Sequence, residues 1–119
     1  MRFVIEHVEN YLRGDLYQRE TVEETRQFLQ AVAAEAVKTG VDRVLISVHS
    51  SRPIFRVEQF GLSELLQSVA LRPTHRVATV ADNYEGRLAQ QYVVFRARQR
   101  GFNVRSFRSE DKAIAWLQS

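Results

Sequence analysis

The pattern of apolar and polar positions at the start of the chain predicts a β-hairpin. Residues 2–9 and 11–17 are rich in branched and aromatic side chains, which favour extended structure. Glu9 and Asn10 between them suit a tight turn. Gly14 lies inside the second expected strand, where a glycine indicates a bulge or a close backbone approach.

The segment after the hairpin has the pattern of an amphipathic helix. Thr21 and Glu24 have the spacing of a capping box, in which the two residues bond each other's backbone N–H groups. Lys38 and Gly40 mark the expected end of the helix. Between these ends, apolar positions recur every three or four residues and form one stripe. The stripe consists of Val22, Thr25, Leu29, Val32 and Ala36.

The remaining chain alternates between the two patterns. We expect strands at 43–48, 75–82 and 103–107, and helices around 62–69, at 84–100 and after the cap residue Ser109. The last helix should place Trp116 in the core. The order β-β-α-β-α-β-α-β-α predicts an α/β fold: a mostly parallel sheet of four or five strands with an N-terminal antiparallel hairpin strand. With 119 residues, we expect a single domain spanning 1–119.

The composition excludes several kinds of functional site. The chain has no cysteine, which excludes disulfides and thiolate metal sites. His7, His49 and His75 do not have the spacing of a metal motif, so we expect no metal ion and no cofactor. The first residues are charged where a signal peptide is apolar, and no apolar run approaches the ~20 residues of a membrane span. We therefore expect a cytoplasmic protein without a membrane span.

Neither nucleic-acid binding nor catalysis is expected. The net charge is +3, but the arginines of the helix at 84–100 project in different directions instead of forming one basic face. No glycine-rich phosphate loop is present. His49 and Ser50 are neighbours on an extended chain and should point to opposite faces, so the histidine is poorly placed to activate the serine.

Polar residues follow two expected neighbouring strands and define a candidate working edge at 49–56 and 82–84. Ligands of open α/β sheets bind at the carboxyl ends of strands. Ser50 and Ser51 are either phosphorylated switch residues or hydroxyls that bond the backbone of a turn. Asp82 and Asn83 either face Ser50 or cap the following helix. The candidate binding residues are His49, Arg52, Phe55, Arg56, Phe60, Asp82, Asn83 and Tyr84.

Four segments together resemble the STAS domains, the fold of bacterial anti-sigma-factor antagonists and of sulfate-transporter tails. They are YLRGDLY, VLISV with its serine-bearing loop, HRVATVAD and VRSFRSEDKAIAWL. The last is typical of a small stand-alone bacterial branch that is sometimes grouped with Sec14-type lipid-binding domains. The resemblance implies a non-enzymatic regulatory domain that binds another protein, either a kinase-like anti-sigma factor or a second copy of itself.

In regulatory STAS domains the loop after the VLISV-type strand carries a phosphorylatable Ser or Thr, usually within Asp-Ser-x-Gly. Ser50 and Ser51 match this position, whereas the aspartate and the glycine are absent from the matching segment, residues 48–53. The resemblance therefore marks the two serines as candidate phosphorylation sites.

A second function stays open: the binding of a lipid or another small apolar molecule between the second helix and the sheet. It is motivated by the apolar side chains of Ile54, Phe55, Phe60 and Leu62 beside the serine loop. The same side chains also suit an ordinary core.

Overall fold

The computed structural model describes residues 1–52 and 75–119, which form an α/β fold around one five-stranded sheet. The spatial order β1-β2-β3-β4-β5 follows the chain. The first two strands pair antiparallel, as the hairpin pattern predicts, and all other pairs are parallel. The strands are β1 (Arg2–Val8), β2 (Tyr11–Tyr17), β3 (Arg43–His49), β4 (Arg76–Ala81) and β5 (Val104–Phe107).

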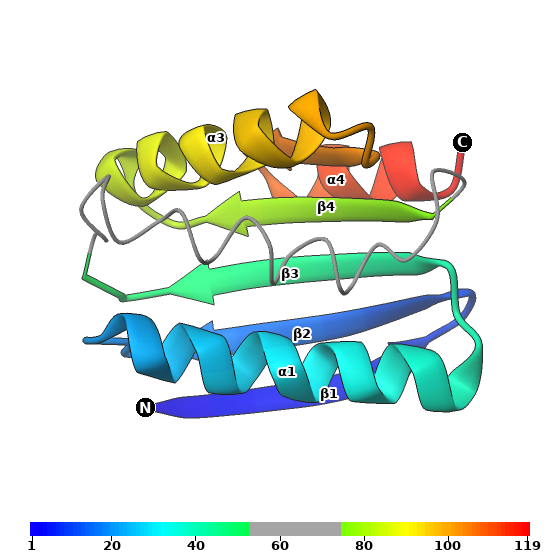
Figure 1. The fold of residues 1–119 in the computed structure, drawn as a ribbon, viewed down its shortest axis with the longest axis horizontal. Helices are drawn as coiled ribbons and strands as arrows, with labels where there is room; N and C mark the ends of the chain where they lie inside the picture. The colour runs from blue at the N-terminus through cyan, green and yellow to red at the C-terminus, as the bar shows by residue number, and fades with distance from the viewer. Residues whose placement is uncertain (53–74) are drawn as a thin grey trace.

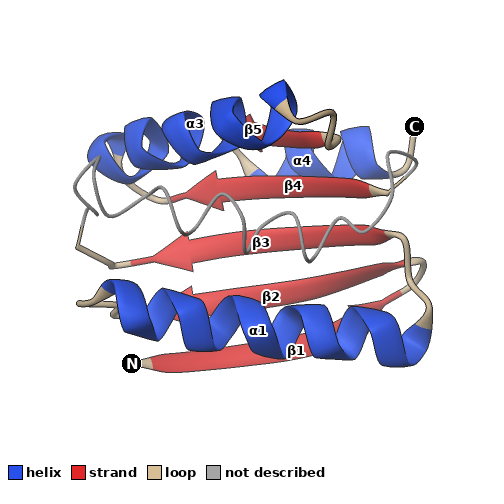
Figure 2. Cartoon of the chain, viewed as in Figure 1, coloured by secondary structure: helices blue, strands red, loops and turns tan. Residues whose placement is uncertain are grey.

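The described helices cover both faces of the sheet. α1 (Val22–Thr39) and α3 (Tyr84–Gln99) lie on one face, and α4 (Glu110–Leu117) lies on the other (Figure 1). Figure 2 shows the same division between strands and helices. None of these helices is long and apolar enough to span a bilayer. The helix expected around 62–69, with Ile54, Phe55, Arg56, Phe60 and Leu62, lies outside the described residues.

Gly14 sits where the first helix comes closest to the sheet. A Cβ atom at this position would lie 3.0 Å from both the Phe28 ring and a methyl group of Val32. Real Cβ contacts are rarely this short, so only glycine lets α1 pack this closely on β2. Of the two expectations for Gly14, the structure shows a close approach to its backbone, made by side chains of α1, and no bulge, because the pairing of β2 is continuous through Gly14.

α1 begins and ends as its sequence predicts. The Thr21 side chain accepts a hydrogen bond from the Glu24 backbone N–H, and the Glu24 carboxylate accepts from the Thr21 backbone. Gly40 ends the helix with a φ of 73°, which glycine adopts without strain. The expected apolar stripe is confirmed but incomplete, because the fully buried Phe28 also belongs to it.

Side chains of the central strands alternate between two different environments. Leu12 and Leu16 of β2 point toward α1 and join the larger apolar cluster. Tyr11 points to the opposite face, where it belongs to a smaller cluster with α4. Trp116 is half-buried beside this cluster, with its ring centroid 5.5 Å from that of Phe107, so its expected core position is only partly realised. α4 has eight residues, and polar side chains lie beside its N-terminus on this face.

Candidate functional site

The carboxyl ends of β2, β3 and β4 meet at one edge of the sheet, because these strands run parallel (Figure 1). This brings the polar residues expected after two strands close together. We call this group the strand-end edge. It consists of His49, Ser50, Ser51, Arg52, Asp82, Asn83 and Tyr84.

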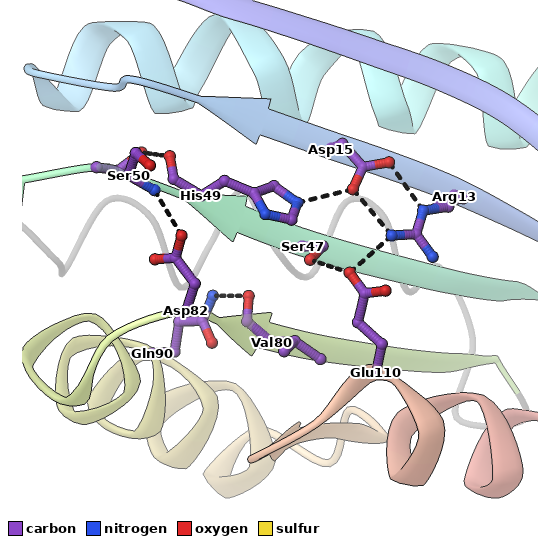
Figure 3. Close-up of polar contacts among 10 residues, drawn as sticks. Arg13, Asp15, Ser47, His49, Ser50, Val80, Asp82, Gln90 and Glu110 are labelled. Atoms are coloured by element: carbon purple, nitrogen blue, oxygen red, sulfur yellow. Dashed lines mark hydrogen bonds and ion pairs between the residues drawn. The ribbon is translucent and has the colours of Figure 1, made fainter.

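Ser50 is the exposed tip of the strand-end edge. Its backbone is left-handed, with a φ of 47°, and its N–H donates to the Asp82 carboxylate over 2.9 Å (Figure 3). The Asp82 N–H in turn donates to the Val48 carbonyl. The expectation that Asp82 faces Ser50 is confirmed, and the contact fixes the Ser50 backbone while leaving its hydroxyl free of any described partner.

Ser51 differs from its neighbour. Its side chain is buried, and its hydroxyl accepts a hydrogen bond from the Arg19 N–H and donates one to the His49 carbonyl. These contacts tie the end of β3 to the end of β2. Ser51 therefore has the backbone-bonding role that short hydroxyl residues often have in turns.

Asn83 and Tyr84 take separate roles at the start of α3. The Asn83 side chain accepts a hydrogen bond from the Gly86 N–H over 2.7 Å and is the N-cap of the helix. The capping interpretation is thus confirmed for Asn83 but not for Asp82. Tyr84 is 66% exposed, and the Arg87 guanidinium lies over its ring, 5.9 Å from the centroid.

His49 points away from Ser50 and toward the α4 side of the sheet (Figure 3). Its ring stacks on Tyr17 with centroids 4.6 Å apart, and its Nε2 lies 2.9 Å from an oxygen of Asp15. Because a carboxylate can only accept, Nε2 carries the proton in this bond. The bond makes His49 a member of a polar group that we call the Arg13 cluster. This cluster consists of Arg13, Asp15, Ser47, His49 and Glu110.

Arg13 holds the cluster together. Its guanidinium makes two hydrogen bonds to Asp15, of 2.8 and 3.1 Å, and one to Glu110 of 2.6 Å. The hydrogen bond to Asp15, outweighing the opposing effect of burial, raises the pKa of Arg13 above its usual value. The guanidinium is therefore a permanent cation between two carboxylates. It connects β2 to the N-terminus of α4.

By residue type, Asp15, His49 and Glu110 could hold a divalent cation, since one ligand atom of each lies within 4.8 Å of the others. The geometry favours a different occupant. One Arg13 nitrogen lies within hydrogen-bond distance of both carboxylates and supplies the positive charge there. The positive charge of this guanidinium would repel a metal ion at the same place. Arg13 is therefore the cation that binds the two carboxylates.

The Arg13 cluster also contains a serine and a histidine, but they are not arranged as a catalytic pair. The Ser47 hydroxyl donates to Glu110 over 2.8 Å instead of bonding His49. The side chain of Ser47 is 1% exposed. A Ser-His-acid arrangement needs the serine within hydrogen-bond reach of the base, so these described residues do not form one.

Sequence reasoning missed Arg13, Asp15 and Glu110. One signal was present: Arg13 and Asp15 are two positions apart on an expected strand and therefore share a face. Two charges on one face of an internal strand require a partner. Glu110, 97 positions further along the chain, could not be identified as that partner without the order of the strands.

Glu110 should make folding stability depend on pH. Burial acts to raise the pKa of its carboxyl, but hydrogen bonds from Arg13 and Ser47 and the Arg13 charge outweigh it, and the pKa lies below its usual value. The unfolded chain therefore binds this proton at higher pH than the folded chain does. The resulting stability is present above the unfolded pKa and is lost as the pH falls through the folded pKa. In Glu110→Gln, urea unfolding across the acidic range should show a smaller loss of stability.

A matched control for this experiment is Glu23→Gln, whose side chain is 67% exposed and pairs with Arg26 at 3.5 Å. It should retain the acid dependence of the wild type. Equal acid dependence in Glu110→Gln and the wild type would contradict the assignment.

On the face of the sheet that α1 and α3 cover, the strand-end edge borders a cavity of about 70 Å³, which we call the Arg19 cavity. Arg19 follows β2 and is only 7% exposed. The apolar lining among the described residues is Leu16, Phe28, Leu29, Ile46, Val48, Ala81, Ala89, Val93 and Val94. The other described lining residues are Arg19, Thr25, Ser51, Thr79, Asn83, Gly86 and Gln90.

No family model matches this chain, and no curated protein sequence matches it significantly. The likeness to STAS domains rests on the four sequence segments and stays a prediction. The α/β fold with its N-terminal hairpin is established independently of that resemblance.

Proposed function

We propose that this chain is a non-enzymatic regulatory domain of STAS type that binds another protein at the strand-end edge, switched by phosphorylation of Ser50. The observation that supports this proposal is the contrast between the two serines. Ser50 is exposed and its hydroxyl has no described partner, whereas the Ser51 hydroxyl is buried and makes two hydrogen bonds. Ser50 is thus the serine of the pair that a kinase can reach.

A phosphate at Ser50 would change the edge through charge. It carries nearly two negative charges at neutral pH, and the Ser50 backbone already contacts the Asp82 carboxylate at 2.9 Å. Repulsion between the phosphate and Asp82 would weaken that contact and alter the surface of the strand-end edge. The STAS resemblance makes a kinase-like regulatory protein the expected partner.

The test compares Ser50→Asp with Ser50→Asn. Both side chains tolerate the left-handed backbone, so they differ mainly by one negative charge. We expect Ser50→Asp to change partner affinity at least several-fold, whereas Ser50→Asn should bind like the unmodified protein. Because Ser50 is exposed, both should unfold within about 0.5 kcal/mol of the wild type.

The measurement begins with the intact mass of the protein isolated from its own cells. A covalent excess of one phosphate that is lost in Ser50→Asn supports the switch, and calorimetric titration of the co-isolated protein then measures affinity. Absence of the phosphate together with equal affinities of the two variants would overturn the proposal. Ser51 is unsuited to this test, because its substitution removes two buried hydrogen bonds.

The Arg19 cavity favours a second candidate function, the binding of a small molecule. Its lining is largely apolar, and it lies at the carboxyl ends of parallel strands. Its volume of about 70 Å³ leaves room for a compact molecule of a few heavy atoms. The cavity therefore fits a small ligand and is too small for a whole acyl lipid.

A further inference from the structure

Arg19 is a buried cation without a carboxylate partner among the described residues. Its guanidinium donates to the Thr25 hydroxyl over 3.3 Å and to the Arg52 carbonyl, both of which are neutral. Its Nε is buried and has no hydrogen-bond partner. Burial lowers the pKa of Arg19, and Glu24 opposes that effect. Burying a charge without a counter-charge is unfavourable, and within residues 1–52 and 75–119 no carboxylate bonds the Arg19 guanidinium, so an anionic ligand would stabilise it.

Glu24 does not supply that counter-charge directly. Its carboxylate accepts hydrogen bonds from the backbone N–H groups of Glu20 and Thr21 and pairs with the N-terminal amine at 3.5 Å. It is therefore occupied outside the cavity and acts on Arg19 only through space.

Two further features of the cavity point to the same kind of ligand. Thr25 and Gly86 belong to the first turns of α1 and α3, so two helix N-termini, with their partial positive charge, border the cavity. Gln90 donates to the Val80 carbonyl over 3.0 Å, but its side-chain oxygen is buried without a partner. The cavity thus holds an unsatisfied donor at Arg19 and an unsatisfied acceptor at Gln90.

We propose that the Arg19 cavity binds a short aliphatic hydroxycarboxylate, with its carboxylate on Arg19, its hydroxyl donating to Gln90 and its carbon chain against Phe28 and Val93. This inference rests on the second candidate function. An anion satisfies the guanidinium, a hydroxyl satisfies the amide oxygen, and the small volume limits the length of the chain.

The experiment titrates the ¹⁵N-labelled protein with lactate, propionate and 1,2-propanediol and follows the backbone amide signals of Arg19 and Ser51 and the Arg19 Nε–H signal. Lactate should give saturable shifts and raise the melting temperature, because a ligand of the folded state stabilises it. Propionate lacks the hydroxyl and should bind at least several-fold more weakly. The diol lacks the charge and should not bind.

Variants assign the response to the cavity. Arg19→Met should abolish lactate binding, whereas Arg26→Met, on the exposed part of α1, should leave it unchanged. If Arg19→Met does not fold, Val93→Phe serves instead, since it fills the cavity while retaining the charge. Lactate shifts that survive substitution of the cavity residues would overturn the proposal.

Each remaining outcome separates this inference from the function on which it rests. Diol binding as strong as lactate binding would refute the anion and leave small-molecule binding standing. Equal binding of propionate and lactate would refute the role of Gln90. If none of the three probes gave saturable shifts, both the inference and the second candidate function would be overturned.

Discussion

Replacing Arg13 with methionine is expected to lower the free energy of unfolding by about 2–4 kcal/mol. The substitution keeps much of the side-chain volume but leaves the Asp15 carboxylate, 6% exposed, without its main cationic partner. Breaking a fully buried ion pair costs about 3–5 kcal/mol, and the 20% exposure of Arg13 reduces this value. Urea unfolding monitored by circular dichroism measures the change.

Two comparisons test the explanation. Arg26→Met removes an arginine from an exposed pair with Glu23 and should change stability by less than about 1 kcal/mol. Arg13→Lys keeps the charge but cannot bridge two carboxylates with one planar group, so its stability should lie between the wild type and Arg13→Met. If Arg13→Met lowered the free energy of unfolding no more than Arg26→Met does, the cluster would not stabilise the packing of α4 on the sheet.

Replacing Phe28 with alanine should have an even larger effect, lowering the free energy of unfolding by about 3–5 kcal/mol. Phe28 is fully buried between α1 and the sheet, and its ring packs edge-on against Phe3 with centroids 5.6 Å apart. Its removal leaves a cavity that rigid strands cannot close. Phe95→Ala, at a position 59% exposed on α3, should change stability by only about 0.5 kcal/mol.

A double-mutant cycle with Gly14 tests the packing directly. Gly14→Ala alone should destabilise by about 1–3 kcal/mol, because the new methyl group meets Phe28 and Val32 at 3.0 Å. In the Phe28→Ala background one of these contacts is absent, so Gly14→Ala should cost less. Equal costs in both backgrounds would show that α1 moves away from the sheet instead of clashing with it.

Much of the fold was predictable because its signals are local. The capping pair Thr21 and Glu24, the glycine at 40 and the strand at 11–17 each depend on neighbouring residues, and the structure confirms them. The bounds of the other described strands differ from expectation by at most one residue at either end. Phe28 was missed because the chosen stripe used one residue per turn, whereas α1 buries a wider face.

The candidate sites were only partly predictable, because their contacts join distant segments. That Ser50 and Asp82 would meet follows from the rule that parallel strands end at the same edge. No such rule connects Arg13 to Glu110. Arg19 gave no signal in the sequence either, because a single arginine after a strand is ordinarily exposed. Its burial arises from the packing of α1 against the ends of β2 and β3.

The contact between Arg13 and Glu110 has a consequence for the order in which the protein can mature on the ribosome. Because each strand pairs with the strand before it, the sheet can grow in the order of synthesis. Glu110 lies in α4 and completes a charge cluster that begins on the second strand. A nascent chain that still lacks this helix therefore holds Arg13 and Asp15 without their third partner. Synthesis of residues 110–119 provides that partner, so the charge cluster can be completed only after α4 has been made.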